Sequence, residues 1–253
     1  HAAYRIAKAA TGRERVLMGD YSYHGWHEWC QRADREVFAH GASYLDLTDV
    51  AAIFVEPHRW EPVSVEWLAW LREACTASGA LLVFDSMIYG GRWHLGGTSG
   101  YFGVIPDLEC YGKALGNGEA IAFVVGQENT RAWGDIPSGT YSGNVAGLAS
   151  AFGTIAIYRE IRAIDILWER GRQLAGGLEA ITSRCDIVKA REGSPVHQRL
   201  VFHRAEDGER FADAMLDRGV IWHPACVNVC AAHTPEQIDR VLEIAEESLR
   251  AIA

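Results

Sequence analysis

Two strand-like runs, with a charged residue close to the end of each, constrain the fold of this chain most strongly. Residues 81–84 read Leu-Leu-Val-Phe, have no helical period and precede Asp85, a pattern typical of a strand buried on both faces. Residues 107–111 form a second strand-like run, after which come Lys113 and the glycine-rich loop 114–118. In open α/β sheets, ligands bind at the carboxyl ends of the strands. We therefore expect Asp85 and Lys113 to share one crevice, although a carboxylate at this place can also simply cap a turn.

An acid and an amine at neighbouring strand ends have a chemical use. Pyridoxal phosphate requires a lysine, which holds its aldehyde as a Schiff base, and a carboxylate, which keeps its pyridine nitrogen protonated. Asp85 and Lys113 meet both requirements. Lysines in surface turns are common, so the pair taken alone also fits an ordinary turn.

The wider sequence resembles the class III aminotransferase family, particularly its glutamate-1-semialdehyde aminomutase-like branch. The resemblance covers nearly the whole chain. The motifs occur in the family's order: Tyr23-His24-Gly25, Val55-Glu56-Pro57, Asp85-Ser86-Met87, Gly90-Gly91-Arg92, residues 101–108, Gly112-Lys113, residues 139–144 and residues 231–234. The resemblance implies a fold type I pyridoxal-phosphate-dependent transferase of the α/β class. Its large domain, with a mostly parallel sheet, would comprise residues 1–170, and its C-terminal α+β small domain residues 171–253.

The resemblance also implies roles for individual residues around the cofactor pyridoxal 5'-phosphate. Lys113 would form the aldimine, and Asp85 would contact the ring nitrogen. Tyr23 would stack on the ring with His24 beside it, and Met87 would pack on the opposite face, where the family usually has valine. Without the other motifs, an aromatic loop of this kind is more simply explained by packing onto the core.

Thr140 is the residue from which a partner subunit is predicted. In the family, this threonine reaches the cofactor phosphate of the neighbouring subunit, which implies a homodimer with shared active sites. Thr140 also stands just before a predicted helix, where a hydroxyl can simply act as a cap. The family's Ser-Gly-(Thr/Ser)-Glu-Ala turn, whose amides hold the phosphate, does not precede the first helix here. We therefore expect the large domain to be N-terminally incomplete relative to the family.

Two further residues are candidates for substrate binding. Arg92 could hold a substrate carboxylate because guanidinium matches it bidentately, although a turn arginine is as often only a surface charge. Glu56 could hold an arginine near the substrate or could simply close its strand. The small-molecule amino donor and acceptor implied by the resemblance are an amino acid, an amine or an amino-sugar-like compound. The alternatives are an intramolecular glutamate-1-semialdehyde-type aminomutase and a non-catalytic relative that lacks the phosphate turn.

The order of the other elements fits an α/β fold. An apolar run at 51–55, a helix that begins after Ser64 and ends at Gly79, and the run at 81–84 predict a right-handed crossover between parallel strands. We expect residues 120–125 to form a further buried strand. Residues 234–237, Thr-Pro-Glu-Gln, predict a capping box at the start of the last helix.

Composition excludes several other classes of protein. The chain is 49% hydrophobic with a formal net charge of −9, and it has no basic stripe for a nucleic acid or an anionic membrane. The longest apolar stretch, 145–158, is too short to span a bilayer and is expected to be a buried helix. Six cysteines without a small-domain disulfide pattern favour the cytoplasm.

A second constellation of residues, near the C-terminus, points to a metal only weakly. His223, Cys226, Cys230 and His233 carry side chains that zinc prefers. In a strand, however, positions 226 and 230 face one side while 223 and 233 face the other. We therefore expect no metal site and a strand with buried cysteines.

Overall fold

The structure, a computed structural model, describes residues 1–31, 36–57, 60, 63–130 and 139–253. The chain forms two compact units: the first contains most residues up to Glu160, and the second contains Ile161–Ala253 together with Trp60. The predicted domain limit at residue 170 falls inside helix α6 (Ala163–Thr182). The domain limits 1–170 and 171–253 stay a prediction.

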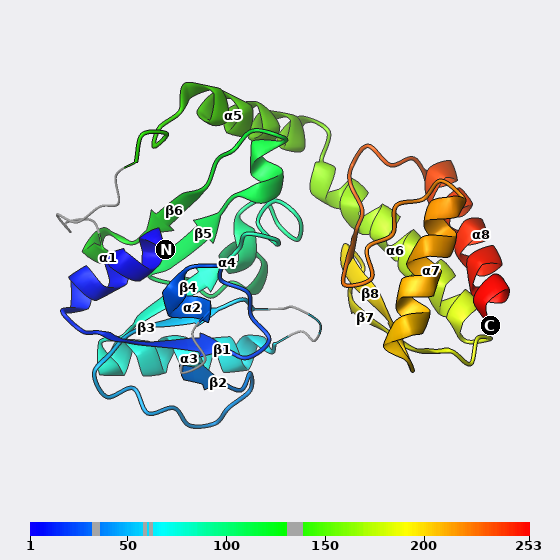
Figure 1. The fold of residues 1–253 in the computed structure, drawn as a ribbon. Coiled ribbons are helices and arrows are strands. Elements are labelled where there is room, and N and C mark those ends of the chain that lie inside the picture. The colour runs from blue at the N-terminus through cyan, green and yellow to red at the C-terminus, as the bar shows by residue number, and fades with distance from the viewer. Residues whose placement is uncertain (32–35, 58–59, 61–62, 131–138) are drawn as a thin grey trace. The chain divides into compact units, whose positions relative to one another are not determined.

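The first unit is built on a six-stranded sheet with the order β2-β1-β3-β4-β5-β6 (Figure 1). The pairs from β2 to β5 are parallel, and only the edge strand β6 runs antiparallel to its neighbour β5. The mostly parallel sheet predicted from the alternation of strands and helices is thus confirmed. The strands are β1 (Arg15–Gly19), β2 (Glu36–Phe38), β3 (Val50–Val55), β4 (Leu81–Asp85), β5 (Leu108–Tyr111) and β6 (Phe123–Gly126).

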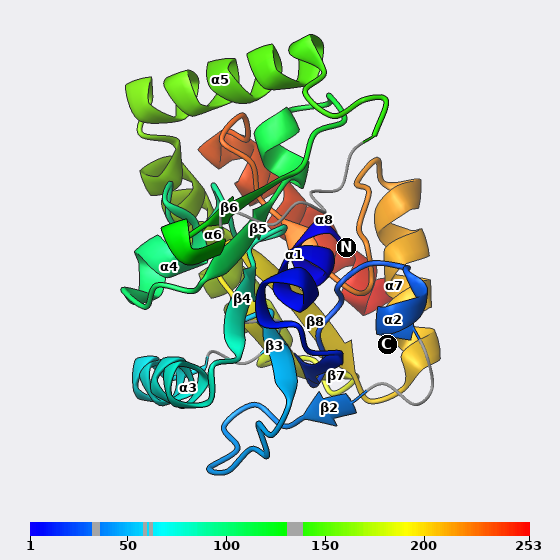
Figure 2. The same ribbon diagram turned by 90° about the vertical axis from the view of Figure 1, so that its left-hand side faces the viewer.

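Helices cover both faces of the central strands. The helical elements of this unit are α1 (Ala2–Thr11), α2 (Glu28–Gln31), α3 (Val65–Ser78), α4 (Gly97–Phe102), α5 (Val145–Glu160) and the 3-10 turns η1 (Lys113–Gly116) and η2 (Glu128–Thr130). Figure 2 shows α1 and α3 on opposite sides of the sheet. Leu82 and Phe84 belong to the core under α3, whereas Val83 belongs to the core under α1. Because side chains alternate along a strand, Asp85 continues the α1 face and Ser86 the α3 face.

Local sequence signals set the ends of the helices as expected. The Ser64 hydroxyl accepts a hydrogen bond from the Trp67 amide at 3.1 Å, and α3 ends at Gly79 in the left-handed conformation with φ of 73°. In the second unit, Thr234 and Gln237 form the predicted capping box at the start of α8 (Pro235–Ile252). These ends were predictable because caps depend on residues adjacent in sequence.

Two expectations for the end of the first unit were wrong. The strand β6 begins at Phe123 and is half-buried to exposed, because as an edge strand it has a single neighbour. Helix α5 is also not buried: Gly147, Ala151 and Thr154 face the protein, while Val145, Leu148 and Phe152 are exposed. Helix α5 is apolar on all sides, and the rest of the first unit covers only one of these sides.

The second unit combines three helices with a small antiparallel sheet. The helices are α6, α7 (Ala205–Asp217) and α8, and the strands β7 (Val188–Ser194), β8 (His197–Phe202) and β9 (Val227–Asn228) pair in this order. This is the α+β composition expected for the C-terminal region. In the part of the chain that the structure describes, no helix combines the length and apolar character needed to cross a bilayer.

Candidate active site

A pocket of about 540 Å³ lies at the carboxyl ends of the central strands, on the α1 face of the sheet. Five of the residues predicted from sequence line it: Tyr23, His24, Asp85, Met87 and Lys113. Three separate stretches of sequence thus meet in one cavity of the first unit. The strand ends bring them together, because β4 and β5 are parallel neighbours in the register Asp85 opposite Cys110.

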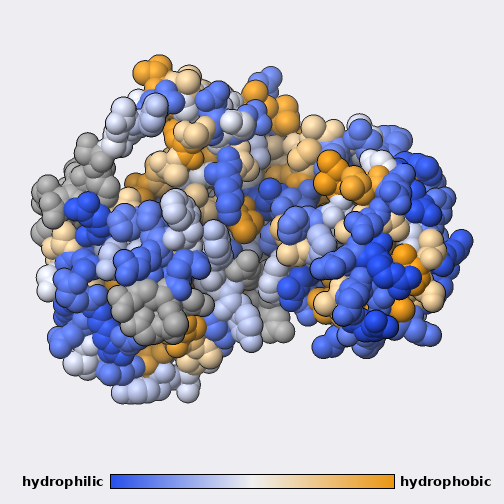
Figure 3. All heavy atoms as spheres, viewed as in Figure 1, coloured by the Kyte–Doolittle hydropathy of each residue, from blue (hydrophilic) through white to orange (hydrophobic). Residues whose placement is uncertain are grey.

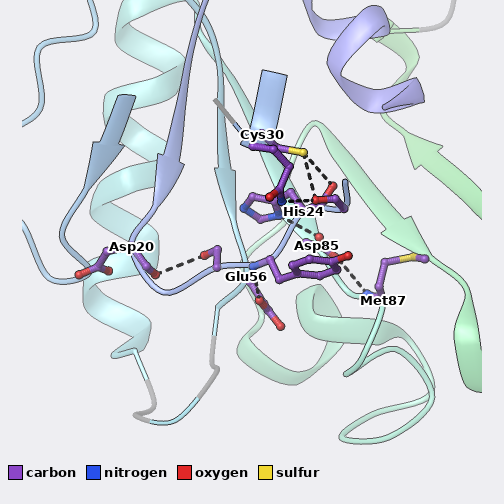
Figure 4. A network of polar contacts seen from close by, with 10 residues as sticks. Asp20, His24, Cys30, Glu56, Asp85 and Met87 are labelled. Carbon is purple, nitrogen blue, oxygen red and sulfur yellow. Dashed lines mark hydrogen bonds and ion pairs between the residues drawn. The ribbon is translucent and has the colours of Figure 1, made fainter. Parts of the chain in front are cut away.

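Asp85 is the most deeply buried charged residue that lines this pocket. Its residue exposure is 8%, and one carboxylate oxygen lies 2.8 Å from Nδ1 of His24. The other oxygen accepts a hydrogen bond from the Met87 amide at 3.1 Å. Figure 4 shows His24 and Met87 on either side of this carboxylate. The side chain is thereby oriented from two directions, and the contact to Asp85 favours the His24 tautomer with its proton on Nδ1.

Glu56 orients the loop that carries Tyr23. The buried carboxylate of Glu56, at the end of β3, accepts a hydrogen bond from the Tyr23 amide at 3.0 Å (Figure 4). The Tyr23 side chain is half exposed at 50% and lines the pocket, so its ring is accessible to a ligand. Glu56 therefore positions the aromatic loop, and its predicted role in holding an arginine near the substrate stays a prediction.

Lys113 is the first residue of the 3-10 turn η1, which follows β5 after one residue. Its backbone is left-handed with φ of 48°, a conformation that costs energy for a residue with a side chain. The residue is exposed and lines the pocket. Strain of this kind persists where the surroundings fix a functional side chain.

Thr140 and Arg92 do not line this pocket. Thr140 is exposed, and Ser142, two residues later, lines the pocket instead. Arg92 is half-buried, and its Nε donates a hydrogen bond to the carbonyl oxygen of Ile88 at 3.3 Å. The predicted roles of Thr140 and Arg92 remain predictions.

Two cysteines at the site were not identified from the sequence. The buried thiol of Cys30 donates towards the carbonyl oxygens of His27 and Gly25, at 3.1 and 3.3 Å, and so braces the loop that contains His24 (Figure 4). Cys110 lines the pocket, and burial together with Asp85 raises the pKa of its thiol to about 12. The Cys110 thiol is therefore protonated at neutral pH. No local sequence pattern indicates that the Cys30 thiol contacts these carbonyl oxygens or that Cys110 lines the pocket.

The histidine and cysteine cluster near the C-terminus has ordinary local contacts. Nδ1 of His223 accepts from the Ala225 amide at 3.1 Å, and Nδ1 of His233 accepts from the Cys230 amide at 3.3 Å. Cys230 is exposed and lies outside β9, so the expected strand with buried cysteines was wrong here. Among the residues that the structure describes, no group of three or more potential ligands could hold a metal ion.

A mostly parallel sheet that presents a buried carboxylate and a lysine at neighbouring strand ends, beside an accessible aromatic ring, defines a class of protein: the pyridoxal-phosphate-dependent enzymes of fold type I. Within that class, the sequence model of the family Aminotransferase class-III matches residues 16–249. The chain belongs to this family, as the resemblance of its motifs predicted.

Individual relatives place the chain among both aminotransferases and aminomutases. It is 28% identical over 281 residues to the 3-aminobutyryl-CoA aminotransferase of Cloacimonas acidaminovorans (strain Evry), with 98% of this chain and 67% of that protein covered. It is 29% identical over 311 residues to the glutamate-1-semialdehyde 2,1-aminomutase of Desulforudis audaxviator (strain MP104C), with 98% and 70% covered. The chain thus spans about two thirds of the length of these relatives.

A solved structure agrees with the fold and with the cofactor. The FumI protein of Sphingopyxis sp. MTA144, in its pyridoxal phosphate internal aldimine form, matches with a TM-score of 0.87 and 29% identity, covering 99% of this chain and 68% of that one. Pyridoxal phosphate is therefore the cofactor of this enzyme. The donor set fits it, since the pocket offers a buried carboxylate for a protonated ring nitrogen and an amine for an aldehyde.

Proposed function

We propose that the protein transfers amino groups between small molecules, with Lys113 and Asp85 as catalytic residues. The observation that carries this proposal is that both side chains line one pocket, with Asp85 buried and held by His24 and with Lys113 accessible. When bound, pyridoxal phosphate supplies the electron sink that labilises the bonds at the substrate Cα. We further propose a cytoplasmic location, which its six free cysteines support.

In this proposal each residue of the chain has a separate task. Asp85 holds a proton on the ring nitrogen, and His24 keeps the Asp85 carboxylate oriented. Tyr23 and Met87 bound the ring from the two sides, and Glu56 keeps the Tyr23 loop in place. The Nζ atom of Lys113 would take the proton from the substrate Cα as general base and deliver it to the cofactor's C4′ as general acid.

The proposal predicts a single turnover with an amino donor alone. A panel of amino acids and amines is mixed with the loaded protein in the absence of an acceptor, and the keto product is quantified. We expect the best donor to yield about one keto product per site, because the amino group stays on the enzyme until an acceptor arrives. A protein that retains the cofactor yet yields no product with any donor would contradict amino-group transfer.

The same experiment separates the second candidate function. The loop at residues 23–26 and the ending at 231–234 resemble the aminomutase branch, and a relative of 29% identity is a glutamate-1-semialdehyde 2,1-aminomutase. An aminomutase moves nitrogen within one molecule, so it would isomerise an amino aldehyde and release no keto product. Isomerisation of such a substrate without a second substrate would decide for the aminomutase.

We also propose that the protein acts as a homodimer. The support is the exposed apolar side of α5, where the exposed fractions of Val145 and Phe152 reach 77% and 74%. In Figure 3, hydrophobic residues lie at the surface over this helix. Exposed apolar residues that gather along one helix are typical of an interface. Thr140 lies just before α5, which agrees with a role at a shared active site.

The variant Phe152→Glu tests the proposed homodimer interface. A charge in the centre of an apolar interface is expected to weaken dimerisation by about thirtyfold or more, because a buried aromatic anchor contributes on the order of 2 kcal/mol. Light scattering over a dilution series measures this, with Ile221→Glu as a control because Ile221 is 91% exposed in the second unit. A wild-type monomer that is fully loaded with cofactor, or an unchanged dimer in Phe152→Glu, would refute the proposed interface.

A further inference from the structure

A buried carboxylate on the face of the sheet opposite Asp85 has no role in the chemistry described above. Glu109 lies on β5 and is only 5% exposed. Within the described ranges of the chain, no lysine, arginine or histidine forms an ion pair with it. A carboxylate in such a setting is stable only where hydrogen-bond donors replace water. The donors that surround Glu109 therefore indicate what it holds together.

These donors come from two segments that follow β4. The Ser86 hydroxyl, directly after Asp85, makes a short hydrogen bond to Oε1 of Glu109. The same oxygen accepts the backbone amides of Thr98 at 2.9 Å and Ser99 at 3.3 Å. Ser86 Oγ lies 2.6 Å from Thr98 Oγ1 as well, so Ser86, Thr98 and Glu109 form one closed network. Ser86 and Thr98 are completely buried.

Backbone geometry shows that the network is tightly built. Gly97 has φ of 73°, and a Cβ at this position would come within 2.6 Å of Oε1 of Glu109. Only glycine allows the backbone to approach the carboxylate this closely. The next inward-facing residue of β5 on the same face, Tyr111, donates its hydroxyl to the Gly96 carbonyl at 3.3 Å. Burial, with a contribution from Glu109, raises the pKa of Tyr111, so its hydroxyl stays a donor.

The network joins the two strands that carry the proposed catalytic residues. Ser86 follows Asp85 at the end of β4, and the Ser86 amide donates to the Cys110 carbonyl of β5 at 3.0 Å. Glu109 lies four residues before Lys113 on β5 and its continuation. The paired register of β4 and β5 ends at Asp85 opposite Cys110, so the side-chain contacts of Ser86 and Glu109 add to the backbone bond that joins the two segments there. A shift of β4 against β5 would move Asp85 relative to Lys113.

We propose that Glu109 is a positioning residue, which holds the carboxyl ends of β4 and β5 so that Asp85 and Lys113 keep the arrangement that binds the cofactor. This inference rests on the proposed roles of Asp85 and Lys113. It also gives Ser86 a role, because a hydroxyl at position 86 donates to the Glu109 carboxylate.

The test compares Glu109→Gln and Ser86→Ala with a matched control, Asp107→Asn. Asp107 is a buried carboxylate at the opposite end of β5, where it accepts from Arg72 at 2.6 Å and from the Leu82 amide at 2.8 Å. Titration with pyridoxal phosphate, followed by visible absorbance, gives the affinity. We expect Glu109→Gln to bind about tenfold more weakly, because its oxygen accepts the Ser86, Thr98 and Ser99 donors without the charge that strengthens these bonds, and Ser86→Ala to shift in the same direction. Asp107→Asn should lower the urea midpoint yet change the affinity by less than about twofold.

Coupling between the two variants gives a readout that does not depend on the cofactor. In urea unfolding of the cofactor-free protein, the effects of the two changes should be less than additive, because Ser86 donates to the same Glu109 oxygen whose charge Glu109→Gln removes. Additive effects, wild-type affinity in Glu109→Gln, or an equal loss of affinity in Asp107→Asn would each overturn the proposal. If Glu109→Gln did not fold, the affinity of Ser86→Ala for pyridoxal phosphate would be the test, and wild-type affinity in that variant would overturn the proposal. A wild type that binds no pyridoxal phosphate would refute the proposed function, whereas the unfolding coupling would still decide on the network.

Discussion

Replacement of Lys113 by alanine is expected to remove both the covalent link to the cofactor and the group that moves the proton. Its Nζ is the only lysine nitrogen in the pocket among the described residues, since Lys8 pairs with Glu14 and Lys189 lies in the second unit. Loss of proton transfer alone lowers turnover by a factor on the order of 10² to 10⁴. The visible absorbance of the purified protein should disappear as well.

A matched control for this variant is Lys189→Ala, which removes an exposed lysine on β7. It should retain the colour and the turnover of the wild type. The measurement is single-turnover formation of keto product together with the absorbance spectrum of each variant. Lys113→Ala with the wild-type spectrum and product yield would show that another residue holds the cofactor.

The second large effect is expected for Asp85→Asn. The amide has nearly the same shape but only one acceptor oxygen, so it can keep one of the two contacts, with His24 or with the Met87 amide, and the cofactor is retained in part. An amide cannot hold a proton on the ring nitrogen as a carboxylate does, so the electron sink is lost. We expect kcat to fall by at least about 10²-fold, the scale of removing one electrostatic group that acts on the transition state.

Asp20→Asn is the control for this effect. Asp20 follows β1 at the same edge of the sheet and contacts Nδ1 of His40, so it reproduces the pairing of an aspartate with a histidine outside the pocket. Its variant should keep kcat within a few fold, although its stability can fall. Equal losses in Asp20→Asn and Asp85→Asn would mean that the effect is general destabilisation rather than loss of a catalytic charge.

The parts of the fold that sequence predicted well are those that depend on neighbouring residues. Ser64 and Gly79 bound α3, and the Thr234 box starts α8, because capping is decided within one turn of helix. The apolar run before Asp85 was recognisable as a strand because it is buried on both faces. The meeting of Asp85 and Lys113 then followed from the rule that parallel strands end at one edge.

The remaining features depend on contacts between residues distant in sequence. The bond between Ser86 and Glu109 spans 23 positions, and neither residue has a local pattern that indicates the other. Likewise, the Cys30 thiol braces the His24 loop through carbonyl oxygens that every residue possesses. The apolar stretch of α5 was correctly expected to be helical, but hydrophobicity alone does not tell whether the same chain or a second copy covers it.

The proposed function depends most directly on the residue that holds the cofactor. Reduction of the purified, coloured protein with borohydride fixes the cofactor to the lysine that carries it, and peptide mapping by mass spectrometry identifies that lysine. The chain offers Lys8, Lys113 and Lys189, which makes the assignment unambiguous. We predict the pyridoxyl mass on the peptide that contains Lys113. The same mass on a peptide containing Lys8 or Lys189, or no labelled peptide from a coloured protein, would contradict the assignment of Lys113 as the residue that holds the cofactor.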